Sequence, residues 1–206
     1  MKVAIVGGTG DFGLALAVRL VDAGDEVVIG SRDAARAEEK AREVGAAGGA
    51  ANEQAVRNVD LVVLATVADA ALATATALVN ALGNTPVLSV ASELQFGRDG
   101  ARPGSDQRSL AERTQELVAG PVAAGLHSLA AGKLAHGRPD EDVFVCGDDA
   151  DAKALALELA AKVVDGRALD AGPLAGARAL EGMTAVIVNL NKGYKGHAGV
   201  RVTGLP

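Results

Sequence analysis

Short apolar runs alternate along the chain with longer segments in which apolar residues recur every three to four positions. The runs are rich in Val, Ile and Leu, as is typical of parallel strands covered on both faces. They span residues 3–6, 26–29, 61–65, 87–90, 122–125, 143–146 and 167–170. The periodic segments predict helices at 12–23, 33–44, 52–58, 68–82, 110–118, 149–163 and 173–192. This alternation predicts an α/β fold with a mostly parallel sheet.

Four glycines stand in the stretch VGGTGDFG, between the first expected strand and the first expected helix. Gly8, Gly10 and Gly13 fit G-x-G-x-x-G, in which the first glycine permits a tight turn, the second admits a pyrophosphate and the third packs the helix on the strand. The positive end of the helix would then face the phosphates. A tight turn without a ligand is the alternative, but it leaves the entropic cost of the glycines without an offset. The residues expected to bind a dinucleotide here are Gly8, Thr9, Gly10, Asp11 and Phe12.

The motif divides the chain into two expected parts. We expect residues 1–120 to form a Rossmann-type dinucleotide-binding half, and residues 121–206 to extend the same sheet and add a long C-terminal helix as a small second domain. Residues 92–109 are rich in Gly, Pro and charge, and we expect a long loop of the kind that often carries function.

The second expected strand ends without the acidic residue that holds the ribose 2′-hydroxyl of NAD. Ser31 and Arg32 stand there instead, and Arg36 follows one helical turn later. These three side chains are suited to a 2′-phosphate, which predicts NADP rather than NAD. The alternative is a solvated helix face on which the two arginines pair with Asp33 and Glu39.

A nicotinamide bound in this way should end at the carboxyl edge of the sheet. Three strands bring small or apolar residues and one histidine to that edge. The residues are Thr66, Val67, Val90, Ala91, Leu126 and His127. Such a pocket suits a flat, uncharged ring.

At this point the chain resembles the NADPH-dependent F-420 reductases, also called F-420H(2):NADP oxidoreductases. The resemblance covers nearly the whole chain. Its most specific stretches are GLHSLAAGKL (125–134), VFVCGDDADAK (143–153), LDAGPLAGARALEGMT (169–184) and YKGHAGVRVTGL (194–205). It implies reversible hydride transfer between NADP(H) and the 5-deazaflavin coenzyme F-420 (F420 below), with Thr184 among the cofactor-binding residues. The chain departs from the family where residues 90–93 lack a proline and where Gly182 replaces a small hydroxyl residue.

One face of the final helix carries Arg178, Gly182, Ala185 and Asn189 at helical spacing. Our hypothesis is that this smooth face borders the deazaflavin and the nicotinamide, with Arg178 near polar groups of the ligand. A contact with another helix, for instance across a dimer, is the equally weighted alternative.

His127 is the titratable group expected near the reacting rings. It is placed to donate a hydrogen bond to the deazaflavin or to help protonate the reduced ring. A structural histidine bonded to the backbone is the alternative. His136 is expected to be exposed in a polar turn.

The C-terminal tail is basic, with Lys192, Lys195, His197 and Arg201. A basic rim would attract the anionic tail of F420, and a solvated terminus is the alternative. Elsewhere, Cys146 is expected to be a small core residue, and the aspartates at 148 and 149 to cap a helix rather than bind a metal.

Composition narrows the class of protein. The net charge is −6, and the chain of 206 residues has only three Phe, one Tyr and no Trp, which argues against nucleic acid and anionic membranes as partners. No signal peptide or apolar span is evident, so we expect a cytoplasmic protein. We also expect a homodimer.

Three other functions share the same dinucleotide unit. One is an NADPH-dependent flavin or ferric reductase, and another is a nucleotide-sensing module without turnover. A reductase of imines or ketones is the third, but it normally needs a longer helical C-terminal domain.

Overall fold

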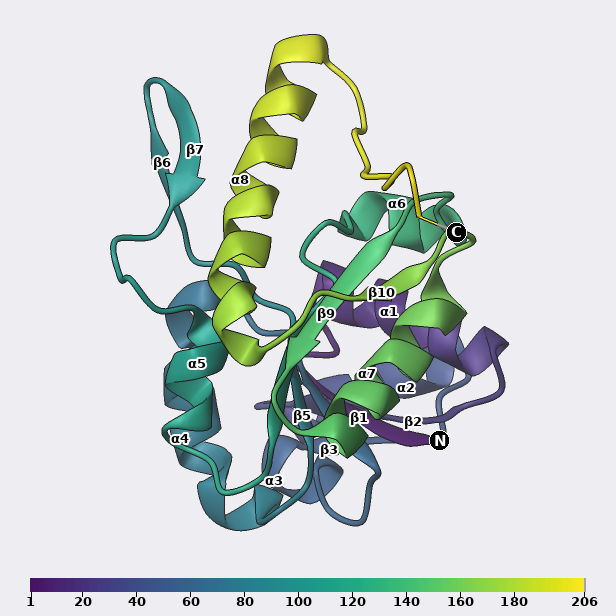
Figure 1. The fold of residues 1–206 in the computed structure, drawn as a ribbon. Coiled ribbons are helices and arrows are strands. Elements are labelled where there is room, and N and C mark those ends of the chain that lie inside the picture. The colour runs from purple at the N-terminus through teal and green to yellow at the C-terminus, as the bar shows by residue number, and fades with distance from the viewer. Residues whose placement is uncertain (206) are drawn as a thin grey trace.

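An eight-stranded sheet forms the centre of the molecule in a computed structural model that describes residues 1–205 (Figure 1). The strand order is β10-β9-β8-β5-β4-β1-β2-β3, and every neighbouring pair is parallel except β8 and β9. The strands are β1 (Lys2–Val6), β2 (Glu26–Ser31), β3 (Gly48–Ala51), β4 (Leu61–Leu64), β5 (Val87–Ser89), β8 (Val122–Gly125), β9 (Val143–Gly147) and β10 (Ala168–Asp170). The expected α/β fold with a mostly parallel sheet, extended by C-terminal strands, is confirmed.

Helices cover both faces of this sheet. They are α1 (Asp11–Asp22), α2 (Ala34–Val44), α3 (Asn52–Ala55), α4 (Ala68–Leu82), α5 (Leu110–Gln115), α6 (Ala131–His136), α7 (Ala150–Val163) and α8 (Ala177–Tyr194). A short 3-10 turn, Leu174–Gly176, leads into α8.

The alternation of side chains along each strand produces two apolar layers. Val3 and Ile5 of β1 point to the layer that packs against α1, α2, α6 and α7. Ala4 and Val6 of the same strand point to the layer that packs against α3, α4 and α5. Both layers are filled by Ala, Val, Leu and Ile, as the low aromatic content requires.

Three elements differ from the sequence expectation. Strand β3 and helix α6 were not expected at all. Residues 92–109 are not one loop, because they contain an antiparallel hairpin of β6 (Leu94–Gly97) and β7 (Gly100–Pro103). This hairpin stands beside α8, beyond the edge of the main sheet (Figure 1).

Several local expectations are confirmed. Asp149 caps α7 by accepting a hydrogen bond from the Ala152 N–H at 2.8 Å. The same expectation is wrong for Asp148, which does not cap α7 but accepts from the Leu174 N–H at 2.9 Å. Cys146 is fully buried in β9. Within residues 1–205, no helix combines the length and the apolar character that crossing a membrane requires.

Candidate active site

The glycine-rich turn links β1 to α1 through very close backbone contacts. Gly7 adopts a left-handed φ of 81°. Gly8 lies inside the turn that the Gly10 N–H closes on the Gly7 carbonyl oxygen at 3.0 Å, so the expectation that Gly8 permits a tight turn is confirmed. A Cβ on Gly8 would lie 2.8 Å from the Ile5 carbonyl oxygen and 3.0 Å from the Ile29 side chain. A Cβ on Gly13 would lie 2.6 Å from the Gly7 carbonyl oxygen, which confirms that Gly13 allows close packing of the helix.

Gly10 differs from these glycines because the packing of the chain does not demand it. Its φ of −82° and ψ of 163° are accessible to any residue. An added Cβ would meet only the Gly7 carbonyl oxygen, at 3.4 Å. Gly10 is also the N-cap of α1, and no side chain caps this helix, so the first N–H groups remain free for an anion.

The end of β2 places three polar side chains beside this turn. Arg32 and Arg36 are exposed, and neither forms an ion pair with another side chain of residues 1–205. Asp33 instead caps α2, where its carboxylate accepts from the Arg36 backbone N–H at 3.1 Å. The Ser31 hydroxyl accepts from the Asp33 N–H at 3.2 Å. The alternative in which Asp33 neutralises the arginines is therefore not what the structure shows.

A cavity of about 400 Å³, the glycine-side cavity, brings these groups together. Of the residues expected from the sequence, it is lined by Thr9, Gly10, Ser31, Arg32, Arg36, Thr66 and Val67. Asn52 and Thr74 also line it, and the sequence did not point to them. The buried Asn52 Oδ1 has no hydrogen-bond partner within the described chain and lies against Gly30 of β2.

A depression of about 420 Å³ adjoins the glycine-side cavity and shares Arg32, Asn52 and Thr74 with it. Its remaining wall is mostly apolar, with Ala73, Ala77 and Leu78 of α4. An apolar slot beside the expected 2′-phosphate position suits an adenine ring.

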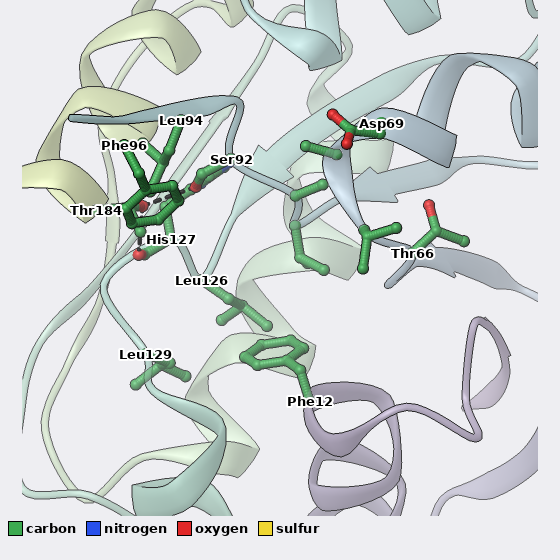
Figure 2. Close-up of a pocket in the computed structure, with 14 residues that line it drawn as sticks. Phe12, Thr66, Asp69, Ser92, Leu94, Phe96, Leu126, His127, Leu129 and Thr184 are labelled. Atoms are coloured by element: carbon green, nitrogen blue, oxygen red, sulfur yellow. Dashed lines mark hydrogen bonds between the residues drawn. The ribbon is translucent and has the colours of Figure 1, made fainter. Parts of the chain in front are cut away.

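The hairpin-side cavity, of about 480 Å³, lies at the carboxyl edge of the sheet (Figure 2). Expected site residues that line it are Phe12, Thr66, Val67, Val90, Ala91, Leu126, His127 and Thr184. Residues not expected there are Ala68, Asp69, Ser92, Leu94, Phe96 and Leu129. The two cavities share Thr66 and Val67. A dinucleotide lying in the first cavity therefore reaches the second at this point.

The backbone is strained where β8 enters the hairpin-side cavity. Leu126 has a φ of 64°, which is unfavourable for a bulky residue, and such strain is found mostly at functional sites. This bend leads into His127, whose side chain is buried, and among residues 1–205 neither ring nitrogen has a hydrogen-bond partner of normal geometry.

Burial sets the charge of His127. It lowers the pKa of the imidazole to about 4, and only the nearby Ala91 backbone opposes this shift. The ring is neutral at pH 7, where it can donate one hydrogen bond to a ligand but carries no extra proton to deliver. The contact between the ring and the Ala91 backbone is the feature that fits the alternative of a histidine bonded to the backbone.

Thr184 joins three segments of the cavity wall. Its hydroxyl donates to the His127 carbonyl oxygen at 2.8 Å, so it accepts from the Ser92 hydroxyl at 2.7 Å. Figure 2 shows this chain of hydrogen bonds from the strand β5 side to α8. The contact fixes α8 against the strand ends that carry His127.

Four expected ligand contacts lie outside the lining of both cavities. Gly8 packs inside the turn, and Asp11 lines a separate groove between α1 and α6. Arg178 donates to the Gly104 carbonyl oxygen at 2.6 Å, and a Cβ on Gly182 would lie 3.6 Å from Pro103. The α8 face that we expected to border the two rings instead packs on the hairpin.

Glu181 lies on the same side of α8 and was not expected. Its buried carboxylate accepts from the Leu110 N–H at 2.6 Å and more weakly from the Glu93 N–H at 3.5 Å. Burial raises its pKa to about 7, although these N–H groups and Arg178 oppose the shift.

The basic tail folds back on the body of the protein. The Asp142 N–H donates to the Val200 carbonyl oxygen at 2.7 Å, and the Val202 N–H donates to Asp142 Oδ2 at 2.8 Å. Arg201 pairs with Asp140. These three polar contacts of the tail are all made with residues just before β9.

Comparison with known proteins identifies the family. Residues 2–93 match the family model described as NADP oxidoreductase coenzyme F420-dependent. The whole chain aligns with the whole of the F420-dependent NADP reductase from Methanothermobacter marburgensis at 35% identity. The chain belongs to the F420-dependent NADP reductase family. The family resemblance expected from the sequence is confirmed.

Solved structures support this placement. A structure from Arthrobacter sp. FB24, assigned as an F420-dependent NADP reductase, covers 99% of this chain and all of its own, with a TM-score of 0.85 and 27% identity. The pyrroline-5-carboxylate reductase of Coxiella burnetii shares the fold, with a TM-score of 0.66 and 14% identity. This chain covers only 65% of that longer protein, whereas it matches F420-dependent NADP reductases over their full length.

Proposed function

We propose that this protein is an oxidoreductase that transfers a hydride between NADPH and the deazaflavin coenzyme F420. The observation that carries the proposal is the meeting of two cavities at Thr66 and Val67, one polar beside the glycine turn and one at the carboxyl edge. The similar full-length relatives bear the name F420-dependent NADP reductase, which supports F420 as the second substrate.

In this proposal residues 1–120 hold NADP, and residues 121–206 supply part of the F420 side of the cleft. Free N–H groups at the start of α1 bind the pyrophosphate, and Ser31, Arg32 and Arg36 bind the 2′-phosphate. Asn52, Thr66 and Thr74, which line the same cavity, provide further polar side chains beside the dinucleotide.

The two coenzymes carry the redox chemistry, and the protein orients them. NADPH gives a hydride, which is two electrons with one proton, to the deazaflavin, and a second proton is taken up from solvent. The neutral His127 donates a hydrogen bond to one ring without titrating near pH 7. Leu126, Val90 and Ala91 keep water from the reacting carbons, which must approach to about 3–3.5 Å.

The test is a mixture of the protein with NADPH and F420, followed by visible absorbance. Loss of the F420 absorbance with equimolar oxidation of NADPH is the expected result. FMN in place of F420 tests the flavin reductase alternative, and NADH in place of NADPH tests the choice of nucleotide. NADPH binding without reduction of either acceptor would leave only a binding module.

The proposal includes a homodimer. Val186, Leu190 and Tyr194 form an apolar stripe on α8, with exposed fractions of 57%, 41% and 83%. Exposed apolar patches of this kind often mark protein interfaces. Sedimentation of the purified protein tests this, and a monomer at micromolar concentration would contradict it. We also propose a cytoplasmic location, where NADPH is available, and cell fractionation tests it.

A further inference from the structure

The β6–β7 hairpin presents one apolar face toward the hairpin-side cavity. Its cross-strand pairs are Phe96 with Ala101 and Leu94 with Pro103, and alternation puts all four side chains on one face. Leu94 and Phe96 line the cavity, near His127 and Thr184 in Figure 2.

Phe96 is notable because it is 73% exposed although it borders this cavity. The chain has only three Phe and one Tyr, and two of these four aromatic residues, Phe12 and Phe96, line the same cavity. An exposed aromatic ring beside a cavity has apolar surface available to cover a flat ligand ring. Phe12 lies across the same cavity in Figure 2.

The hairpin has little apolar core to hold it in this position. Of its eight strand residues only Ala101 is buried. Asn189 of α8 instead grips the backbone of Ala101: its Oδ1 accepts from the Ala101 N–H at 2.8 Å, and its Nδ2 donates to the Ala101 carbonyl oxygen at 2.7 Å. Ala101 stands directly opposite Phe96 in the ladder, so Asn189 fixes the strand pair that carries Phe96.

The contact between Asn189 and the hairpin also explains why residue 100 is a glycine. Gly100 has a φ of 117°, and a Cβ there would lie 2.3 Å from Asn189 Oδ1. Any side chain at this position would push the Asn189 amide away from the hairpin.

We propose that Phe96 contacts the flat ring of the hydride acceptor, and that Asn189 is the positioning residue that holds Phe96 over it. This proposal rests on the proposed function, and it adds the acceptor-side wall to the site. Changes in the hairpin should therefore affect the binding of F420 and not that of NADPH, because in the proposed function the NADPH phosphates lie in the glycine-side cavity, away from the hairpin.

The first test compares equilibrium binding of F420 and of NADPH, together with the KM for each. Phe96→Ala is expected to weaken F420 binding and raise its KM roughly tenfold, with the Kd of NADPH unchanged. Phe96→Trp, which keeps a flat ring, is expected to stay near the wild type. Gln95→Ala is the matched control, because Gln95 faces the other side of the hairpin.

The second test concerns Asn189. Asn189→Ala is expected to raise the KM for F420 severalfold in the same direction as Phe96→Ala. Asn191→Ala is its matched control, because the Asn191 Oδ1 accepts from the Ala198 N–H of the tail at 2.5 Å rather than from the hairpin. Equal effects of the two Asn variants would overturn the positioning role.

The natural chain has no Trp, so Phe96→Trp also supplies a single fluorescent reporter. Bound F420 is expected to protect this Trp from acrylamide quenching, and Asn189→Ala in the same chain is expected to reduce that protection. A Trp placed by Gln95→Trp is expected to remain accessible.

The outcomes separate the two proposals. If the wild type binds and reduces F420 while Phe96→Ala binds it equally well, only the role of Phe96 is wrong. If Phe96→Ala weakens NADPH as much as F420, the hairpin does not distinguish the substrates and this inference fails. If the wild type neither binds nor reduces F420, the proposed function fails and this inference fails with it.

Discussion

At the scale of single residues, the glycines in the turn between β1 and α1 are required for different physical reasons. Gly7 needs a left-handed φ, and Gly8 and Gly13 make backbone contacts that leave no space for a Cβ. Gly10 alone among them has both an ordinary φ and open space beside it. Mutation to alanine can therefore distinguish a glycine that the fold requires, which should lose stability, from a glycine that the ligand requires, which should lose binding.

Gly10→Ala is expected to keep the protein folded, with a free energy of unfolding close to that of the wild type. Alanine restricts the unfolded chain, which contributes about 0.4–1 kcal/mol, but it is a poorer N-cap than glycine, and the two effects offset each other. The added methyl group should nevertheless weaken NADPH binding at least tenfold by obstructing the pyrophosphate. Thermal unfolding and NADPH titration measure the two effects.

Gly13→Ala is the comparison for that variant. Its Cβ would lie 2.6 Å from a carbonyl oxygen, so we expect a clear loss of thermal stability. If Gly10→Ala binds NADPH like the wild type, the phosphates do not lie at this turn.

Arg32 decides between the two nucleotides. Charge-assisted hydrogen bonds contribute about 1.5–3 kcal/mol, so Arg32→Ala should weaken NADPH binding by about 10- to 100-fold and leave NADH nearly unchanged. Arg42→Ala is the control, because Arg42 lies on α2 and donates to the Glu38 carbonyl oxygen instead of lining the cavity. Equal losses for NADPH and NADH would place the 2′-phosphate elsewhere.

At the scale of elements, the sequence predicted those whose reason for forming is local. Strands such as β4 and β5 are continuous apolar runs, and α4 was expected with its observed bounds of Ala68–Leu82. Strand β3 has the sequence GGAA, which carries no strand signal. It forms by pairing with β2, in a register that places Gly49 beside Ile29. A Cβ on Gly49 would collide with the Ala37 carbonyl of α2, so close packing of α2 determines this composition.

The candidate site shows the same division. The glycine turn, the arginines and the strand ends were predictable, because each follows a recognisable strand. The hairpin was not, because it is held by Asn189 and Arg178, which lie far along the chain in α8. Long-range polar contacts of this kind leave no periodic pattern in the hairpin's own sequence. Because of them, the face of α8 that we expected to border the two rings packs on the hairpin instead.

The tail that follows α8 is another element held by a few polar contacts. Asp142 accepts from the backbone N–H groups of Val202 and Arg167 and from the Arg167 guanidinium, which together hold its pKa well below the usual range. Asp142→Asn should loosen the tail and accelerate tryptic cleavage after Lys195 severalfold.

Limited proteolysis followed by mass spectrometry measures that rate. Asp140→Asn is the control, since it removes only the exposed pair with Arg201. Unchanged cleavage in Asp142→Asn would mean that the remaining backbone contacts hold the tail without this carboxylate.

At the scale of the whole molecule, two buried ionisable groups make stability depend on pH in opposite directions. The pKa of His127 falls from 6.5 to about 4 on folding, so its contribution to stability is lost as the pH falls from 6.5 to 4. The pKa of Glu181 rises from 4.5 to about 7, so its contribution is complete below pH 4.5 and is lost as the pH rises through 7. The two effects oppose each other between pH 4.5 and 6.5, and above pH 6.5 only the Glu181 effect remains.

Glu181→Gln should therefore change the slope of stability between pH 6.5 and 8. In the wild type the Glu181 carboxyl loses its proton over this range inside a cluster that contains Arg178, Glu93 and the first turn of α5. A pKa near 7 gives a fall of about 1 kcal/mol, or about 2–4 °C in Tm. Glutamine keeps an oxygen for the Leu110 N–H but does not ionise, so its Tm should stay level.

Calorimetry of wild type, Glu181→Gln and the exposed Glu38→Gln over this pH range makes the comparison. Glu38→Gln should follow the wild type, because no buried contact changes. A wild-type Tm that is level from pH 6.5 to 8, or a Glu181→Gln Tm that falls in parallel with it, would show that Glu181 does not take up its charge there. The expected divergence would mean that α8, α5 and the base of the hairpin are packed around a carboxyl that is half ionised near neutral pH, so the hairpin-side cavity would be held most firmly on the acid side of pH 7.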